Sequence, residues 1–270
     1  MQPTHSSKNH PYQIIDPSPW PLLAALGALL LGVGGALAMH GYTAIAVILG
    51  GVIVVLAAAA WWHDMIHESN TKDIYTDKVQ LSLRIGMVLF ITSEVLFFAG
   101  FFGSYFYSAL SSEALHGVWP PKNIVTLDPF HLPYLNTLIL LLSGTTVTWA
   151  HHALVQNNLE DALKGLLLTI CLGISFTCVQ IYEYGHAAFG LKDGVYGSNF
   201  YMATGFHGLH VIIGTLFLSV CAYRTWKKDF SPKAHVGLEA AAWYWHFVDA
   251  VWLFLFVSIY WWGDSATFSH

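Results

Sequence analysis

Seven long apolar runs, separated by shorter polar stretches, dominate the sequence. A helix needs about 20 mostly apolar residues to cross the roughly 30 Å hydrocarbon core of a bilayer, and each run is close to this length or longer. The pattern therefore predicts an all-α integral membrane protein with seven transmembrane helices. The predicted spans lie near residues 20–39, 42–62, 81–107, 133–154, 162–184, 199–224 and 239–262.

The composition indicates the same class of protein. Hydrophobic residues make up 55% of the 270-residue chain and charged residues only 10%, which is typical of a membrane protein. The phosphate-binding pattern GxxxxGK[ST] does not occur in the sequence, which argues against a nucleotide-driven pump. We expect no nucleic-acid partner.

The distribution of Lys and Arg predicts the orientation, because segments rich in these residues stay on the inner side of a membrane. With the N-terminus inside, only Lys122 and Lys192 fall in outer loops. We therefore predict that the N-terminus lies inside and the C-terminus outside. The basic residues of the inner segments and helix ends are Lys8, Lys72, Lys78, Arg84, Lys164, Arg224, Lys227, Lys228 and Lys233.

The first two spans differ in character from the other five. Only "HGY" at 40–42 joins them, which predicts a tight helical hairpin without internal charge, followed by a polar loop at 63–78. We interpret residues 1–270 as a single membrane domain with a two-helix arm at 20–62 and a five-helix arm at 81–262. The later spans carry carboxylate and histidine side chains, among them Glu94, Glu183, His207, His210, Glu239, His246 and Asp249.

Glu94 lies in the middle of the apolar stretch "LFITSEVLFFAGFF" at 89–102. A charge at this depth is expensive, so we expect a largely neutral carboxyl unless another helix supplies a donor. Three interpretations stay open: a proton-relay carboxyl, a polar group at a cleft for lipid or a partner, and a protonated group that hydrogen-bonds across helices. Its neighbours one helical turn away offer no partner and are Phe90, Ile91, Phe97 and Phe98.

Several histidines are candidates for a metal or haem site. "GFHGLHV" places His207 and His210 three residues apart, and "WYWHFVD" adds His246 three residues before Asp249. Imidazoles at such spacing can bind iron, copper or zinc, but packed membrane helices also use them as hydrogen-bonding groups. "TWAHHAL" adds two histidines near the inner end of the fourth span, at 151 and 152, which are either proton-handling or ordinary interfacial groups.

Four long motifs resemble those of subunit III of cytochrome c oxidase. They are "RIGMVLFITSEVLFF" at 84–98, "LNTLILLLSGTTVTWAHHAL" at 135–154, "YMATGFHGLHVIIGTLFL" at 201–218 and "EAAAWYWHFVDAVWLFLFVSIYWWG" at 239–263. The resemblance extends from about residue 10 to residue 263. It implies that the seven helices form a V of two bundles, helices 1–2 and helices 3–7, with ordered phospholipids in the cleft.

The resemblance also implies how the work is divided within the complex. Electrons from cytochrome c reduce oxygen to water, coupled to proton pumping, in partner subunits I and II, which carry haem a, haem a3 and copper. This chain is expected to hold no metal, no cofactor and no catalytic centre, and the histidines become packing residues. It would stabilise subunit I, hold lipids and support proton uptake.

Individual residues take expected roles from the same resemblance. Glu94 would face the lipid cleft, and His10 would lie near the proton entrance of subunit I. Tyr75 stands where some relatives carry a histidine, so no headgroup contact is inferred there. The residues expected near lipid headgroups are Trp62, Glu68, Arg84 and Arg224.

We expect the complex in a bacterial inner membrane, with the mitochondrial inner membrane as the alternative. Two other functions remain to be compared with an accessory oxidase subunit. An independent transporter would move protons or ions by itself, and a haem-binding redox protein would show its own visible absorbance.

Overall fold

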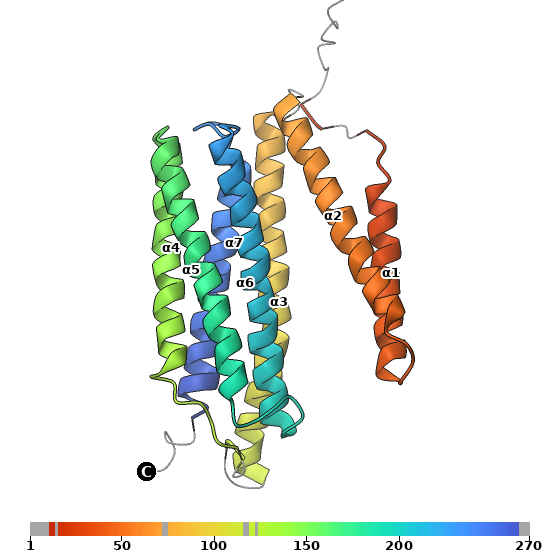
Figure 1. The fold of residues 1–270 in the computed structure, drawn as a ribbon, viewed down its shortest axis with the longest axis vertical. Helices are drawn as coiled ribbons and strands as arrows, with labels where there is room; N and C mark the ends of the chain where they lie inside the picture. Colours follow the sequence, from red (N-terminus) through yellow and green to blue (C-terminus); the bar gives the residue numbers. More distant parts are fainter. Residues whose placement is uncertain (1–10, 14–15, 72–74, 116–118, 122–123, 265–270) are drawn as a thin grey trace, which may run out of the picture. The chain divides into compact units, whose positions relative to one another are not determined.

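A computed structural model describes residues 11–13, 16–71, 75–115, 119–121 and 124–264 (Figure 1). In these residues the chain forms seven α-helices, the last continued by a short π-helical segment, η1. The elements are α1 (Trp20–Met39), α2 (Ile45–Thr71), α3 (Asp77–Leu115), α4 (Leu132–Val155), α5 (Leu159–His186), α6 (Gly194–Trp226), α7 (Val236–Leu255) and η1 (Phe256–Trp261).

All seven helices are long and apolar enough to cross a membrane, which confirms the predicted all-α membrane fold. The helix ends differ from the prediction. Helix α2 continues to Thr71, through residues assigned to a polar loop at 63–78, and α3 extends to Leu115. An apolar run marks the part of a helix inside hydrocarbon, whereas the helix itself continues as long as the backbone meets no helix breaker.

The chain divides into two compact units, Met1–Leu83 and Arg84–His270, with the boundary inside α3. In the first unit, α1 and α2 form the predicted antiparallel hairpin. The turn after α1 contains Gly41 with a φ of 86°, a left-handed conformation that glycine adopts without a steric penalty. The backbone of α1 lies close to Gly50 of α2, where a Cβ would be only 2.6 Å from the backbone nitrogen of Leu31.

This close approach gives a prediction with a control on the adjacent residue. Gly50→Ala should destabilise the hairpin by about 1–3 kcal/mol, because the new methyl group meets backbone that cannot move aside. Gly51→Ala should be neutral or stabilising, since the nearest atom is 3.8 Å away and alanine favours a helix. Both are measured in the purified oxidase as resistance to detergent unfolding. Equal effects of the two substitutions would rule out the contact.

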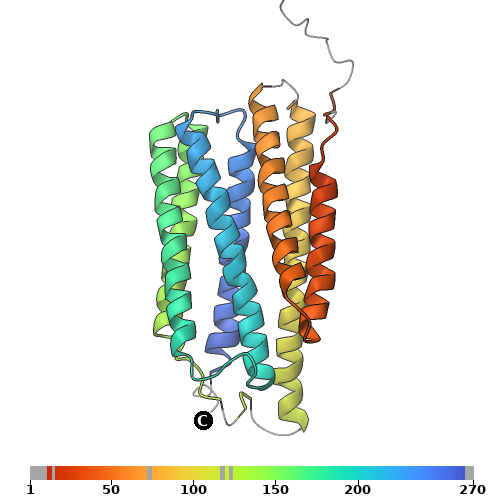
Figure 2. The ribbon, with the colours of Figure 1, turned by 45° about the vertical axis from the view of Figure 1, so that its right-hand side comes forward.

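In the second unit, α4, α5, α6 and α7 form a ring in which each helix contacts the next and α7 contacts α4 (Figure 2). Large side chains fill its interior, and α3 joins through Phe98 and Tyr105, which are also buried. The Tyr105 hydroxyl donates to the carbonyl of Ser258 in η1 at 2.9 Å. The interior residues with almost no exposed surface include Val147, Leu166, Phe176, Leu218, Trp245 and Trp252.

A short turn makes α4 and α5 antiparallel neighbours. Asn157 has a φ of 62°, a conformation that asparagine tolerates better than most residues. Asn158 then caps α5, because its Oδ1 accepts a hydrogen bond from the Asp161 backbone N–H at 3.2 Å. Glu160 and Asp161 in the first turn place negative charge at the positive end of the helix dipole.

Candidate functional site

Glu94 of α3 has a hydrogen-bonding partner on another helix. Its Oε2 lies 2.8 Å from Nε2 of His210 on α6. The pair is enclosed, with 21% of the Glu94 side chain and 9% of the His210 side chain exposed. Aromatic rings surround the imidazole, including Phe98 at 5.1 Å and Tyr244 at 6.2 Å between ring centroids.

The hydrogen bonds of His210 restrict where its protons lie. Its Nδ1 is 2.7 Å from the carbonyl oxygen of Phe206, which can only accept, so Nδ1 carries a hydrogen. The contact between Nε2 and the carboxyl then needs one more proton, held either by Glu94 or by the imidazole. The arrangement can therefore hold one shared proton, and it ties α3 to α6.

The other histidines of the metal hypothesis have separate partners. His207 is buried, with Nε2 3.1 Å from the carbonyl oxygen of Val248, and its ring packs 5.1 Å from that of Trp252. His246 contacts Thr148 and Asp249. Within the described residues, His207, His210 and His246 do not converge on one point. The separate partners give no support to a joint metal site made by these three residues.

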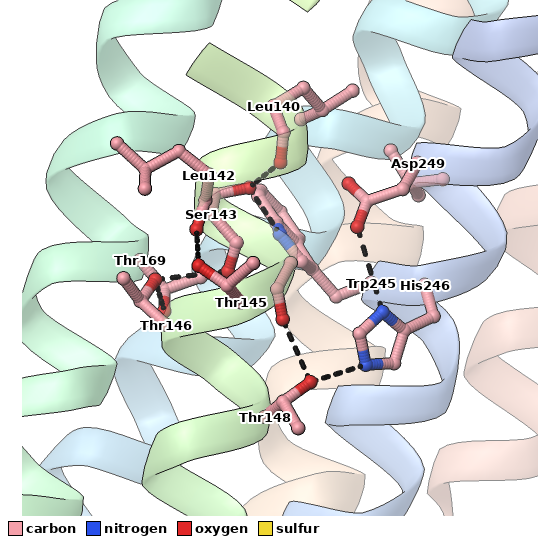
Figure 3. A network of polar contacts seen from close by, with 12 residues as sticks. Leu140, Leu142, Ser143, Thr145, Thr146, Thr148, Thr169, Trp245, His246 and Asp249 are labelled. Carbon is pink, nitrogen blue, oxygen red and sulfur yellow. Dashed lines mark hydrogen bonds and ion pairs between the residues drawn. The ribbon is translucent and has the colours of Figure 1, made fainter. Parts of the chain in front are cut away.

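His246 belongs to a polar network between α4 and α7 (Figure 3). Its Nε2 lies 3.2 Å from the Thr148 hydroxyl, and its Nδ1 lies 3.6 Å from Oδ2 of Asp249. On the interior side, the Trp245 indole donates to the Ser143 hydroxyl at 2.8 Å. His246 and Asp249 border a shallow groove on the surface of this unit, and the described residues offer Oδ1 of Asp249 no hydrogen-bond partner.

The residues expected near lipid headgroups lie in both units. Trp62 and Glu68 are on α2 of the first unit, where Trp62 is 63% exposed. Arg84 begins the second unit and donates from Nε to Oε2 of Glu239 on α7 at 2.7 Å. Arg224, in the last turn of α6, stacks over the Phe230 ring at 4.3 Å. His10 lies outside the described residues.

Sequence reasoning named Glu183, Glu239 and His151 singly, but it missed the partners that the second unit brings to them. Glu183 is buried on α5, and its Oε1 accepts a hydrogen bond from the Tyr260 hydroxyl at 2.7 Å. His151, His235 and Glu239 meet where α4 ends and α7 begins. Spacing could have identified the pairing of His235 with Glu239, because Glu239 follows His235 by four residues in the first turn of a helix. The approach of His151 could not, because it depends on tertiary packing.

These features define a polytopic membrane protein whose internal histidines and carboxyls connect neighbouring helices. A family model described as cytochrome c oxidase subunit III matches residues 10–264. The chain belongs to the cytochrome c oxidase subunit III family, which confirms the resemblance, and it is therefore a component of a membrane-bound oxidoreductase complex.

Individual relatives match over nearly their whole length. Cytochrome c oxidase subunit 3 of Danio rerio is 53% identical over 256 residues, which cover 94% of this chain and 98% of the relative. The subunit 3 of Dugong dugon is 53% identical over 262 residues, covering 97% and 100%. That of Pylaiella littoralis is 52% identical over 263 residues, covering 96% and 97%.

Proposed function

We propose that this chain is a non-redox core subunit of cytochrome c oxidase that stabilises subunit I, retains phospholipids and supports proton uptake. In this proposal subunits I and II bind haem a, haem a3 and copper and pass electrons from cytochrome c to oxygen. The observation that carries it is the match to the family over residues 10–264. The separate hydrogen-bond partners of His207, His210 and His246 support a structural use of these histidines.

The groove between α4 and α7 supports a stabilising contact with a partner subunit. Nearly half of the His246 side chain, 47%, is exposed there beside Asp249, inside a membrane-spanning helix. Ionisable groups facing hydrocarbon are unfavourable, and in membrane proteins they usually face protein or water. A partner subunit that covers the groove would remove this cost and would offer Asp249 a hydrogen-bond donor.

Retention of phospholipid is supported by the cationic and aromatic end of α6. Lys227 lies 5.6 Å from the Tyr223 ring centroid and 5.4 Å from that of Trp226, beside Arg224. Cationic side chains next to interfacial aromatic rings are suited to anionic headgroups. We propose headgroup contacts for Arg224, Arg84, Trp62 and Glu68, an acyl-chain contact for the α3 surface near Glu94, and support of proton uptake by His10.

Removal of the chain tests this function. We expect an oxidase purified through a tag on this chain to contain haem, and we expect the haem to stay with the remaining subunits when detergent strips the chain away. The stripped enzyme should still consume oxygen but should inactivate after fewer turnovers, because subunit I has lost its lipids and its support. Oxygen consumption over time and an optical spectrum of each fraction measure this.

Adding the purified chain back together with phospholipid is the control, and it should restore the working lifetime. Haem that travels with this chain would contradict the proposal and favour a redox protein. Proton or ion transport by the chain alone in vesicles would favour an independent transporter.

We place the complex in an inner membrane that carries respiration. The bacterial inner membrane stays our prediction, with the mitochondrial inner membrane as the alternative, and the N-terminus is predicted inside. Reporter fusions to each terminus, together with fractionation of the source cells, measure both properties.

A further inference from the structure

Two histidines and a glutamate bring potential metal ligands together at one end of the second unit. His151 lies in the last turn and a half of α4, His235 directly precedes α7, and Glu239 lies in the first turn of α7. One ligand atom from each residue lies within 4.8 Å of the other two. His235 is buried and the other two are partly buried, so the group is not a random encounter of mobile surface side chains.

The hydrogen bonds of His235 leave its second nitrogen facing the other two residues. Its Nδ1 is 3.0 Å from the carbonyl oxygen of Ser231, which can only accept, so Nδ1 carries the hydrogen. In the neutral imidazole, Nε2 is then a lone-pair atom. This Nε2 lies 3.4 Å from Oε1 of Glu239, which also offers a lone pair.

His151 contributes a third atom without a competing partner. Its Nε2 is buried, and no hydrogen bond to it is present among the described residues. Its ring centroid is 5.5 Å from that of His235. A buried polar atom that lacks a partner is unfavourable, and three converging lone pairs repel one another. A cation bound between them would satisfy all three atoms at once.

Arg84 holds the carboxylate in a position that suits this role. It donates from Nε to Oε2 of Glu239 at 2.7 Å, while Oε1 of the same carboxylate lies 3.4 Å from Nε2 of His235. Hydrogen bonds of this kind orient the ligands of metal sites in proteins. The bond that His235 donates to the Ser231 carbonyl oxygen is another. The positive charge of the guanidinium also repels a metal ion bound beside it. The bound metal ion should therefore exchange with solution rather than be permanently held.

We propose that His151, His235 and Glu239 form an exchangeable site for a divalent transition-metal ion of the zinc class. The ligand atoms are Nε2 of each histidine and Oε1 of the glutamate, and a water molecule completes a tetrahedron. Zinc accepts imidazole and carboxylate ligands at about 2.0–2.2 Å, whereas magnesium and calcium prefer oxygen ligands alone. The bound ion links the end of α4 to the start of α7.

Zinc binding to the intact oxidase tests the proposal, with His152 as the matched control. The complex is treated with a chelator, titrated with Zn²⁺, and analysed for bound zinc by mass spectrometry. His151→Ala should weaken binding at this site at least about tenfold, because changes in residues that merely orient ligands already cost 10–100-fold. His152→Ala should leave binding unchanged, since this neighbouring residue is not part of the group. An excess of Mg²⁺ added together with Zn²⁺ should not displace Zn²⁺ from this site.

Two further measurements separate metal binding from misfolding. Zn²⁺ should raise the temperature at which the chain dissociates from the wild-type complex and from the His152→Ala complex, but not from His151→Ala or His235→Ala. All variants are compared at equal haem content, so a complex that fails to assemble is recognised before the titration. If His151→Ala and His235→Ala both bind zinc as wild type does, or if His152→Ala loses as much, the proposal is overturned. Neither result bears on the proposed role of the chain in the oxidase.

Discussion

Replacing Trp245 with alanine is expected to lower the free energy of unfolding of the second unit by about 3–5 kcal/mol, the usual cost of deleting a large buried aromatic side chain. Trp245 is 0% exposed and projects from α7 into the ring of helices. Its indole fits against glycines on two other helices: a Cβ at Gly173 or Gly214 would lie 2.7 Å or 2.8 Å from the ring. It also donates to the Ser143 hydroxyl on α4 at 2.8 Å.

The loss has two causes that a second substitution separates. Trp245→Phe keeps most of the ring contacts with α5 and α6 but removes the hydrogen bond to Ser143, so it should cost clearly less than Trp245→Ala. Trp149→Ala on α4 is the matched control, because this tryptophan is 42% exposed. Detergent titration of the purified oxidase measures all three. A loss at Trp245→Ala no larger than at Trp149→Ala would contradict the packing described here.

Run length identified the number of spanning helices, but not where they end. The stretch at 63–71 is polar and was assigned to a loop, yet it continues α2 as far as Thr71. Nothing in that stretch breaks a helix, and its polar side chains can lie beyond the hydrocarbon. Hydropathy measures the preference for hydrocarbon, whereas the hydrogen-bonded backbone determines the helix. The two properties therefore agree in the middle of a span and differ at its ends.

The partners of the polar residues depended on tertiary packing. The sequence showed that the helix of Glu94 supplies no donor, but it could not identify His210 on α6 as the partner. Likewise, the sequence placed His207 and His210 three residues apart on one predicted helix. Residues three apart are still about 60° apart around the axis at 3.6 residues per turn. That difference directs His207 to Val248 and His210 to Glu94.

Removing one partner of the Glu94 and His210 pair is expected to destabilise the second unit. His210→Leu leaves the Glu94 carboxyl among apolar side chains without its hydrogen bond, and Glu94→Leu does the same to Nε2 of His210. Each should cost about 3–5 kcal/mol if the pair is ionised, and about 1–3 kcal/mol if it is neutral. The double substitution to leucine should lose less than the sum, because neither polar group is then left alone. Strict additivity would contradict a direct interaction.

Glu94→Gln decides which form of the pair the second unit contains. We expect the neutral form, because separating charges in apolar surroundings costs more than sharing one proton. The glutamine amide can then donate to Nε2 of His210 in place of the protonated carboxyl, while Nδ1 keeps its bond to Phe206. The loss should stay below about 1 kcal/mol, with normal lipid content and working lifetime. A glutamine variant as damaged as the leucine variant would show instead that a carboxylate faces an imidazolium.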